Sequence, residues 1–106
     1  MKIAMTSPNA KNISGHAGKC PGYLIYEIDE NKNIQKTHLK LAKEQVFQNF
    51  SGPLSRSPNH PLNGINIFVT QSIGEGLNRR LNEDGIKVYT TENKDTEEII
   101  QSLLMN

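Results

Sequence analysis

Short apolar runs separated by polar turns organise most of this chain of 106 residues. Runs of about four to eight apolar or alternating positions predict β-strands. We expect about five strands, at Lys2–Thr6, Tyr23–Ile28, Ile34–Leu41, Ile65–Val69 and Ile86–Tyr89. The polar turn at residues 29–33 predicts that the second and third strands form a hairpin.

Apolar residues at helical spacing predict a helix after the fourth strand. Ile73, Leu77 and Leu81 repeat every four residues, and Gly85 supplies a C-terminal stop. Ser72 and Glu75 have the spacing of a capping box, in which each side chain satisfies the other's free backbone amide. The helix is therefore expected to begin at this serine.

A second helix is predicted at the end of the chain. Asp95 to Glu98 resembles another capping box, and an apolar stripe follows it. The stripe consists of Ile99, Ile100, Leu103 and Leu104. Earlier in the chain, Lys43–Phe50 predicts a turn or two of amphipathic helix, and the proline-rich segment 51–63 predicts a surface loop.

The order of these elements predicts the fold class. A hairpin of strands comes first, and strand, helix, strand and helix follow, so the last two strands should pair in parallel through a right-handed crossover. We expect an α/β fold with a mixed sheet and helices packed on it. At this length residues 1–106 form one domain with a real core.

Composition limits the possible partners. The net charge is +1 and aromatic residues make up 6% of the chain, so nucleic-acid binding is not expected. No apolar window approaches the length of a membrane span. The chain has one cysteine and no secretory signal, which favours a reducing, cytoplasmic compartment.

One segment carries candidate chemistry, the glycine-rich loop Asn9–Gly22 between the first two strands. It holds His16 and the single thiol, Cys20, four residues apart. Imidazole and thiolate suit soft or borderline metals, and a neighbouring cation such as Lys19 would favour the thiolate. The pattern predicts a contact site for a metal or a metallocluster.

A structural interpretation of the same residues stays open. A lone cysteine such as Cys20 is more often a small buried hydrophobe than a ligand. The pair of His16 and Cys20 also lacks the four-ligand pattern of a structural zinc site. His38 and His60 have no glycine-rich surroundings, and we expect surface roles for both.

The loop also resembles a known family. Ser14-Gly-His-Ala-Gly-Lys-Cys20, followed by Tyr23-Leu-Ile-Tyr-Glu-Ile28, is similar to the signature of the nitrogenase iron–molybdenum cofactor-binding family of NifX-like domains. Further similarity lies in Gly64–Thr70, Ile73–Gly76 and Gly85–Tyr89. The family typically has His-Phe-Gly where this chain has Ala17 in place of the phenylalanine.

The resemblance implies a ribonuclease-H-like layered α/β fold and a non-enzymatic accessory role related to nitrogen fixation. The cargo it implies is iron–molybdenum cofactor or an iron–sulfur cluster, with cluster donor and acceptor proteins as partners. His16 and Cys20 would be metal ligands or near-ligands. The residues expected to form the cofactor-binding loop are Ser14, Gly15, His16, Gly18 and Cys20.

Two other functions of such a fold fit the sequence poorly. In Gly74-Glu-Gly76 the third glycine of a dinucleotide-binding fingerprint would fall at Arg79. A two-metal nuclease needs carboxylates clustered on the sheet, and the strand Lys2–Thr6 has none. Thr6 and Ser7 have no visible base partner, so nucleophilic catalysis is not expected.

The hypothesis that results is a small metallocluster carrier that takes up a cluster but no stoichiometric zinc. Replacing His16 or Cys20 by alanine is expected to weaken uptake without unfolding the domain. The alternative is a regulatory or interaction module that binds a small anion or a protein, with Cys20 as a redox-sensitive thiol. Both hypotheses predict an accessible, reactive Cys20, and the carrier hypothesis predicts a mobile loop at 9–22.

Overall fold

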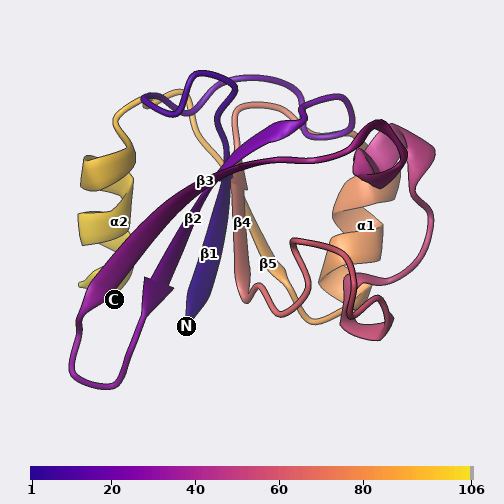
Figure 1. Cartoon of the computed structure of the whole chain (residues 1–106). Helices are drawn as coiled ribbons and strands as arrows, with labels where there is room; N and C mark the ends of the chain where they lie inside the picture. The colour runs from indigo at the N-terminus through magenta and orange to yellow at the C-terminus, as the bar shows by residue number, and fades with distance from the viewer. Residues whose placement is uncertain (106) are drawn as a thin grey trace.

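The computed structural model describes residues 1–105, and a five-stranded sheet forms its centre (Figure 1). The strands lie in the order β3-β2-β1-β4-β5. Their bounds are Lys2–Thr6 for β1, Gly22–Ile28 for β2, Ile34–Lys40 for β3, Ile67–Thr70 for β4 and Lys87–Thr90 for β5. All five predicted strands are present: β1 has the predicted bounds, and the ends of the others differ by at most two residues.

The direction of the strands follows the sequence prediction. β2 pairs antiparallel with both β1 and β3, whereas β1, β4 and β5 are parallel. β2 alone therefore runs against the other four strands. The hairpin turn between β2 and β3 is held by the Asp29 carboxylate, which accepts from the amides of Asn31 and Asn33. The predicted α/β class with a mixed sheet is confirmed.

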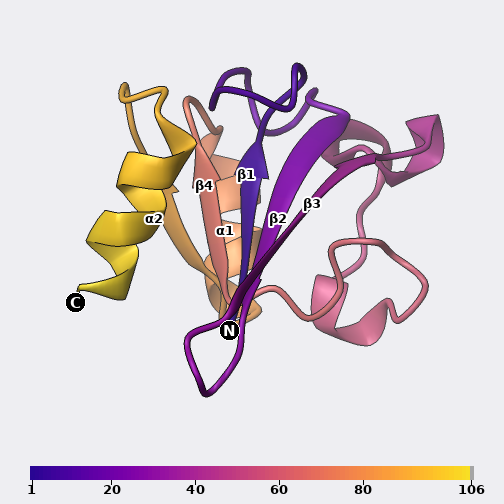
Figure 2. The same cartoon turned by 60° about the vertical axis from the view of Figure 1, so that its left-hand side comes forward.

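Helices cover both faces of the sheet (Figures 1 and 2). Helix α1, Glu75–Glu83, lies on one face with the segment that joins β3 to β4. Helix α2, Thr96–Leu104, lies on the other face. Alternate strand residues supply the two cores: Ala4 and Phe68 face α1, while Ile3 and Val69 face α2.

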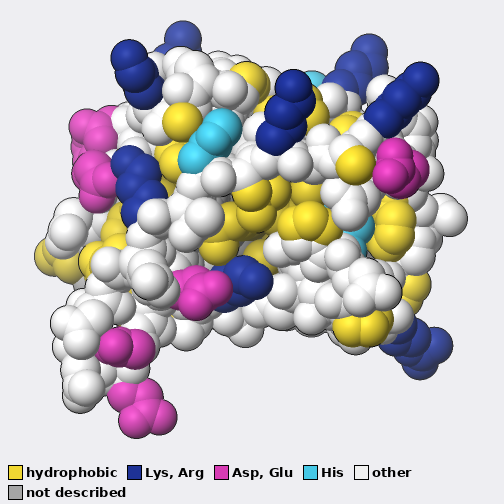
Figure 3. All heavy atoms as spheres, in the orientation of Figure 1, with side chains coloured by type: hydrophobic (Ala, Val, Ile, Leu, Met, Phe, Trp, Pro, Cys, Tyr) yellow, Lys and Arg dark blue, Asp and Glu magenta, His cyan; other side chains and the backbone are white. Residues whose placement is uncertain are grey.

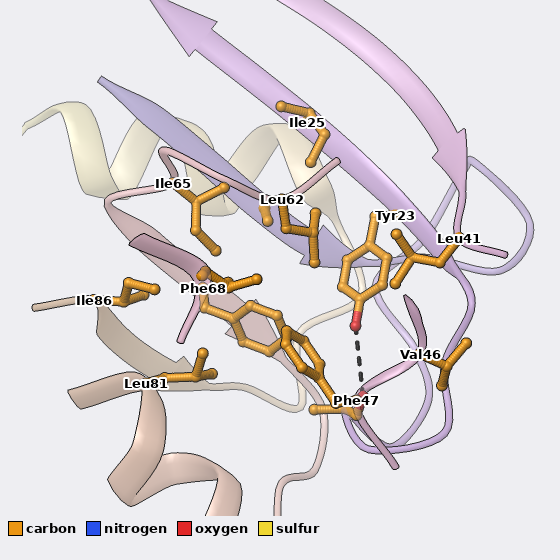
Figure 4. Close-up of a cluster of buried hydrophobic side chains, with 13 residues drawn as sticks. Tyr23, Ile25, Leu41, Val46, Phe47, Leu62, Ile65, Phe68, Leu81 and Ile86 are labelled. Atoms are coloured by element: carbon orange, nitrogen blue, oxygen red, sulfur yellow. Dashed lines mark hydrogen bonds between the residues drawn. The ribbon is translucent and has the colours of Figure 1, made fainter. Parts of the chain in front are cut away.

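The core on the α1 side is built around three aromatic rings. Tyr23 lies 5.9 Å from Phe68 and Phe47 lies 5.8 Å from Phe68, measured between ring centroids. Figure 4 shows these rings surrounded by aliphatic side chains from β2, α1 and the β3–β4 segment. The β3–β4 segment is therefore an integral part of this core.

The β3–β4 segment is less helical than predicted. Where we expected an amphipathic helix at Lys43–Phe50, there are two short 3₁₀ turns, η1 at Lys43–Gln45 and η2 at Phe47–Asn49. Val46 between them is extended, with ψ 137°, which interrupts the helical ladder. A third turn, η3 at Leu54–Arg56, lies within the predicted loop.

The two predicted capping boxes have different outcomes. Asp95 caps α2, because its carboxylate accepts from the amides of Glu97 and Glu98. Ser72 does not cap α1, so that prediction is wrong: the helix starts three residues later, after Gly74, without a side-chain cap. The Ser72 hydroxyl is instead engaged with His16.

Within residues 1–105, no helix has the length and apolar character needed to cross a membrane.

Candidate functional site

The glycine-rich loop lies where the topology of the sheet changes direction. β1 and β4 are parallel neighbours, and the chain leaves them toward opposite edges of the sheet, to β2 and to β5. In open α/β sheets such a switch point, outside the carboxyl ends of the strands, is where ligands bind. Residues 7–21 and 71–74 follow these two strand ends and lie together at the top of Figure 1.

Backbone contacts fix the first of these loops to both strands. The amide of Ser14 donates to the carbonyl oxygen of Thr6 at 3.1 Å, at the end of β1. The amide of Ala17 donates to the carbonyl oxygen of Ser72 at 2.8 Å, beyond the end of β4. His16 and Ser72 also form an isolated parallel β-bridge. The loop therefore holds a defined position across the switch point.

Polar side chains of the β4 end reinforce this arrangement. The Gln71 side-chain oxygen accepts from the amide of Gly15 at 3.2 Å. The Thr6 hydroxyl donates to the Thr70 hydroxyl at 3.0 Å, and the Thr70 hydroxyl lies 3.1 Å from the Ser72 carbonyl oxygen. Both threonines are fully buried. These hydroxyl contacts hold the end of β1 and the end of β4 together at the start of the two loops.

The side chain of His16 is exposed on the loop. Its Nδ1 lies 2.8 Å from the Ser72 hydroxyl oxygen. A Cβ at Gly18 would lie 3.7 Å from His16 Cδ2 and 3.8 Å from Nε2, so the absence of a side chain there leaves the region beside Nε2 open. The ring is thus held at one nitrogen and free at the other.

Two glycines are required by the shape of the loop. Gly15 has φ +97°, a left-handed conformation that disfavours other residues. At Gly22 a Cβ would lie 2.8 Å from the Ser7 carbonyl oxygen and 2.9 Å from Pro8 Cα, because the start of β2 packs against the residues that follow β1. These close approaches bring the loop back over the sheet.

Cys20 lies in a different environment from His16. It is 4% exposed, and its Sγ donates to the carbonyl oxygen of Gly22 at 3.2 Å. Burial raises the pKa of the Cys20 thiol, and hydrogen bonds from the backbone offset this only in part. The predictions of an accessible thiol and of a favoured thiolate are wrong, because the side chain is buried and desolvation is the largest influence on its pKa.

Ala17 occupies the position where the family typically has phenylalanine. It is completely buried within the core on the α1 side, and its carbonyl oxygen accepts from the Tyr23 hydroxyl at 3.5 Å (Figure 4). Together with Ile13, which is buried on the α2 side, it anchors the loop in both cores. Expected loop mobility stays a prediction, although these anchors weigh against it.

The other two histidines lie apart in the fold. His38 is exposed on β3, with Nε2 3.3 Å from the Ser7 carbonyl oxygen. The surface role expected for His60 is wrong, since this residue is 5% exposed. Its Nε2 lies 2.9 Å from the Gln45 carbonyl oxygen, and its Nδ1 accepts from the amide of Leu62. His60 is a structural link within the β3–β4 segment.

Sequence reasoning missed the contribution of the β4 end to the site. The sequence pattern predicts no role for Thr70 and Gln71, and it predicts Ser72 to be a helix cap. A signal was available: residues directly after adjacent parallel strands meet at one edge of a sheet. The predicted order of strands was not specific enough to show that β4 lies next to β1.

The described residues do not assemble a complete site for a bare ion. Within residues 1–105, no three histidine, cysteine, aspartate or glutamate side chains lie close enough together to hold a metal. A hollow of about 670 Å³ lies at the opposite end of the sheet, lined by residues that include Met1, Ile28 and Asn66. The switch-point loop therefore presents its imidazole at the surface.

Exposed lysines lie around this end of the molecule, together with carboxylates such as Glu44 and Asp95. Lys11 and Lys19 are exposed on the loop, Lys40 ends β3, and Lys43 begins η1. Figure 3 shows lysine and arginine side chains projecting along the upper edge of the molecule, the edge to which these elements belong.

Solved structures share the fold. A protein from Methanocaldococcus jannaschii, provisionally named a dinitrogenase, has a TM-score of 0.71 and 19% identity, over 99% of this chain and 88% of that one. A Thermotoga protein provisionally named NifB has a TM-score of 0.63 and 18% identity, over 99% and 88%. The apo form of the orange protein from Desulfovibrio gigas has a TM-score of 0.64 and 17% identity, over 98% and 87%.

No curated protein sequence matches the chain significantly. The family model described as dinitrogenase iron-molybdenum cofactor matches residues 1–106, the whole length of the sequence. Because the match covers the strands, both helices and the switch-point loop, this chain belongs to the dinitrogenase iron-molybdenum cofactor family.

Proposed function

We propose that this protein carries a preassembled iron–molybdenum or iron–sulfur cluster, held as cargo at the switch-point loop through His16. The observation that carries the proposal is an exposed imidazole with one nitrogen held by Ser72 and the other free, on a loop fixed between β1 and β4. Membership of the family supports a role in handling metalloclusters.

The donor set fits a cluster better than a single ion. One imidazole leaves a tetrahedral zinc ion mostly coordinated by water, and structural zinc sites use four protein ligands. A cluster brings its own sulfides and needs the protein at only one or two metal positions. The exposed lysines, Lys11 and Lys19 among them, would favour an anionic cluster without binding it irreversibly.

Cys20 does not contact the cluster in the closed loop of this proposal. The sequence predicts that it is a ligand or near-ligand, and that assignment stays a prediction. Its burial and its bond to the Gly22 carbonyl oxygen mean that coordination would require the loop to open. We therefore assign the contact in the closed loop to His16, with Ser14, Gly15 and Gly18 shaping the backbone around it.

We also propose a non-enzymatic role, which the contacts of Ser7 support. The Ser7 hydroxyl donates to the carbonyl oxygen of Asn12, and His38 approaches the Ser7 backbone oxygen and not its hydroxyl. No activated nucleophile results from these contacts. The partners we propose are proteins that donate the cluster to this loop and accept it from there.

The alternative of a regulatory module with a redox-sensitive Cys20 has less support. Redox-sensing thiols are accessible and have a lowered pKa, whereas the Cys20 thiol is buried and its pKa is raised. Uptake of an iron–sulfur cluster without tight zinc binding is expected of the carrier and not of the regulatory module, so metal binding distinguishes the two functions.

The test is an anaerobic titration of the apo-protein with a synthetic thiolate-ligated [4Fe–4S] cluster, followed by gel filtration and absorbance. We expect the cluster to co-elute with the protein near one equivalent, and zinc to remain weakly bound. His38→Ala is the matched control because it removes another exposed imidazole outside the loop. Stoichiometric tight zinc, or no cluster retained by the wild-type protein, would contradict the proposal.

A further inference from the structure

The hydroxyl of Ser72 contacts the imidazole of His16. The two residues are 56 positions apart in sequence, and a parallel β-bridge sets their backbones side by side. The hydroxyl oxygen lies 2.8 Å from Nδ1, a full hydrogen bond. The Ser72 backbone is itself fixed, since its carbonyl oxygen accepts from Ala17 and lies near the Thr70 hydroxyl.

Ser72 does not cap helix α1, although its sequence context predicts that it does. Its spacing to Glu75 matches a capping box, yet helix α1 begins after Gly74 with no side-chain cap. The hydroxyl that would have capped the helix contacts the histidine of the other loop. If Ser72 served only to stabilise the helix, its hydroxyl would accept from a backbone amide of the first helical turn. Its contact with His16 therefore indicates a role at the imidazole.

We propose that Ser72 is the positioning residue of the site: its hydroxyl oxygen accepts a hydrogen bond from Nδ1–H of His16 and leaves the lone pair of Nε2 facing outward. This inference rests on the proposed function. Histidines that bind metals donate their other ring N–H to an acceptor of this kind, which fixes both the tautomer and the ring orientation. Gly18 keeps the space beside Nε2 open, so the oriented nitrogen is accessible.

The consequence for cargo binding is a loss of affinity when the hydroxyl is removed. Outer partners of metal-binding histidines typically contribute about 10–100-fold to metal affinity. Ser72→Ala should weaken uptake of the synthetic [4Fe–4S] cluster by this factor, while Ser72→Thr, which keeps a hydroxyl, should restore most of it. Gln71→Ala separates support of the loop from control of the tautomer, because it removes a loop contact to Gly15 and leaves Nδ1 untouched. Its uptake should fall by less than that of Ser72→Ala.

The deciding experiment needs no cluster. Nitrogen-15 NMR of the apo-protein at a pH where His16 is neutral reports which ring nitrogen carries the proton. We expect Nδ1–H in the wild type, Ser72→Thr and Gln71→Ala, and a shift toward Nε2–H in Ser72→Ala. Nε2–H in the wild type, or one tautomer in all four proteins, would overturn the role of Ser72. Failed cluster uptake with the expected tautomers would overturn the proposed function instead.

Discussion

The backbone amide of Cys20 donates to the carbonyl oxygen of His16 at 3.0 Å, yet the two side chains lie in opposite environments. The imidazole is exposed at the switch point, and the thiol is buried beneath the loop. Sequence spacing suggested a pair of ligands, and the structure separates them by burial. This separation leads to different expectations for the two residues.

The first prediction concerns the reactivity of Cys20. Because the thiol is 4% exposed and burial raises its pKa, iodoacetamide should modify the native protein far more slowly than the unfolded chain. Alkylation followed by mass spectrometry, with and without urea, measures this. Rapid modification of the native protein at neutral pH would mean that the loop opens readily.

The second prediction is a loss of stability at alkaline pH. Both Cys20 and Tyr23 have their pKa raised by burial. Below the pKa of an unfolded thiol, about 8.5, the folded and unfolded chains both keep the proton. Above it the unfolded chain releases the proton first, so the free energy of unfolding falls as pH rises toward the folded pKa.

Urea unfolding at a series of pH values from about 7 to about 11 tests this expectation. Tyr23 adds to the decline above about pH 10, where an unfolded tyrosine ionises. Cys20→Ala should flatten the first part of the curve, and Tyr23→Phe should flatten the second. A stability that is constant over this range in the wild type would show that neither group is effectively buried.

A third prediction uses the open space at Gly18. Gly18→Val should place methyl groups beside Nε2 of His16 and lower cluster uptake, because a Cβ added at this glycine would lie 3.8 Å from the nitrogen. The fold should survive, since the Cβ meets only the far edge of the ring. Gly76→Ala, at a glycine with no atom within 4 Å of the added Cβ, is the control. Equal uptake by both variants would show that the cluster does not approach Nε2.

The fourth prediction concerns His60. His60→Phe should keep its ring against Phe47 and Phe50 but leave the Gln45 carbonyl oxygen and the Leu62 amide without their partner. Unsatisfied buried polar groups cost about 1–3 kcal/mol each, so for the two groups we expect a loss of about 2–6 kcal/mol in urea unfolding. The change should also loosen the loop, because Gln48 in this segment donates to the Gly18 carbonyl oxygen. A loss below about 1 kcal/mol would show that water replaces both bonds.

Much of the fold could be predicted from the sequence because its signals are local. Nearly continuous apolar runs predict β1 and β2, and both strands are buried along almost their whole length. Asp95 predicts the start of α2, where its carboxylate caps the helix. Ser72 shows the limit of such signals. Its spacing to Glu75 is a valid local motif, but a contact 56 residues away takes the hydroxyl.

The candidate site could be predicted only in part for the same reason. The loop and His16 are visible in sequence as glycines around an imidazole. The burial of Cys20 and His60 depends on how the loop and the β3–β4 segment pack on the sheet, which no local spacing reports. Desolvation then decides the state of the Cys20 thiol.

The most direct measurement compares His16→Ala and Cys20→Ala in the same anaerobic [4Fe–4S] titration, with urea unfolding to verify that both variants are folded. Our account predicts that His16→Ala loses most of the uptake, while Cys20→Ala retains it, because the exposed imidazole and not the buried thiol contacts the cluster. Retained uptake in His16→Ala together with its loss in folded Cys20→Ala would contradict the account and assign the contact to the thiol.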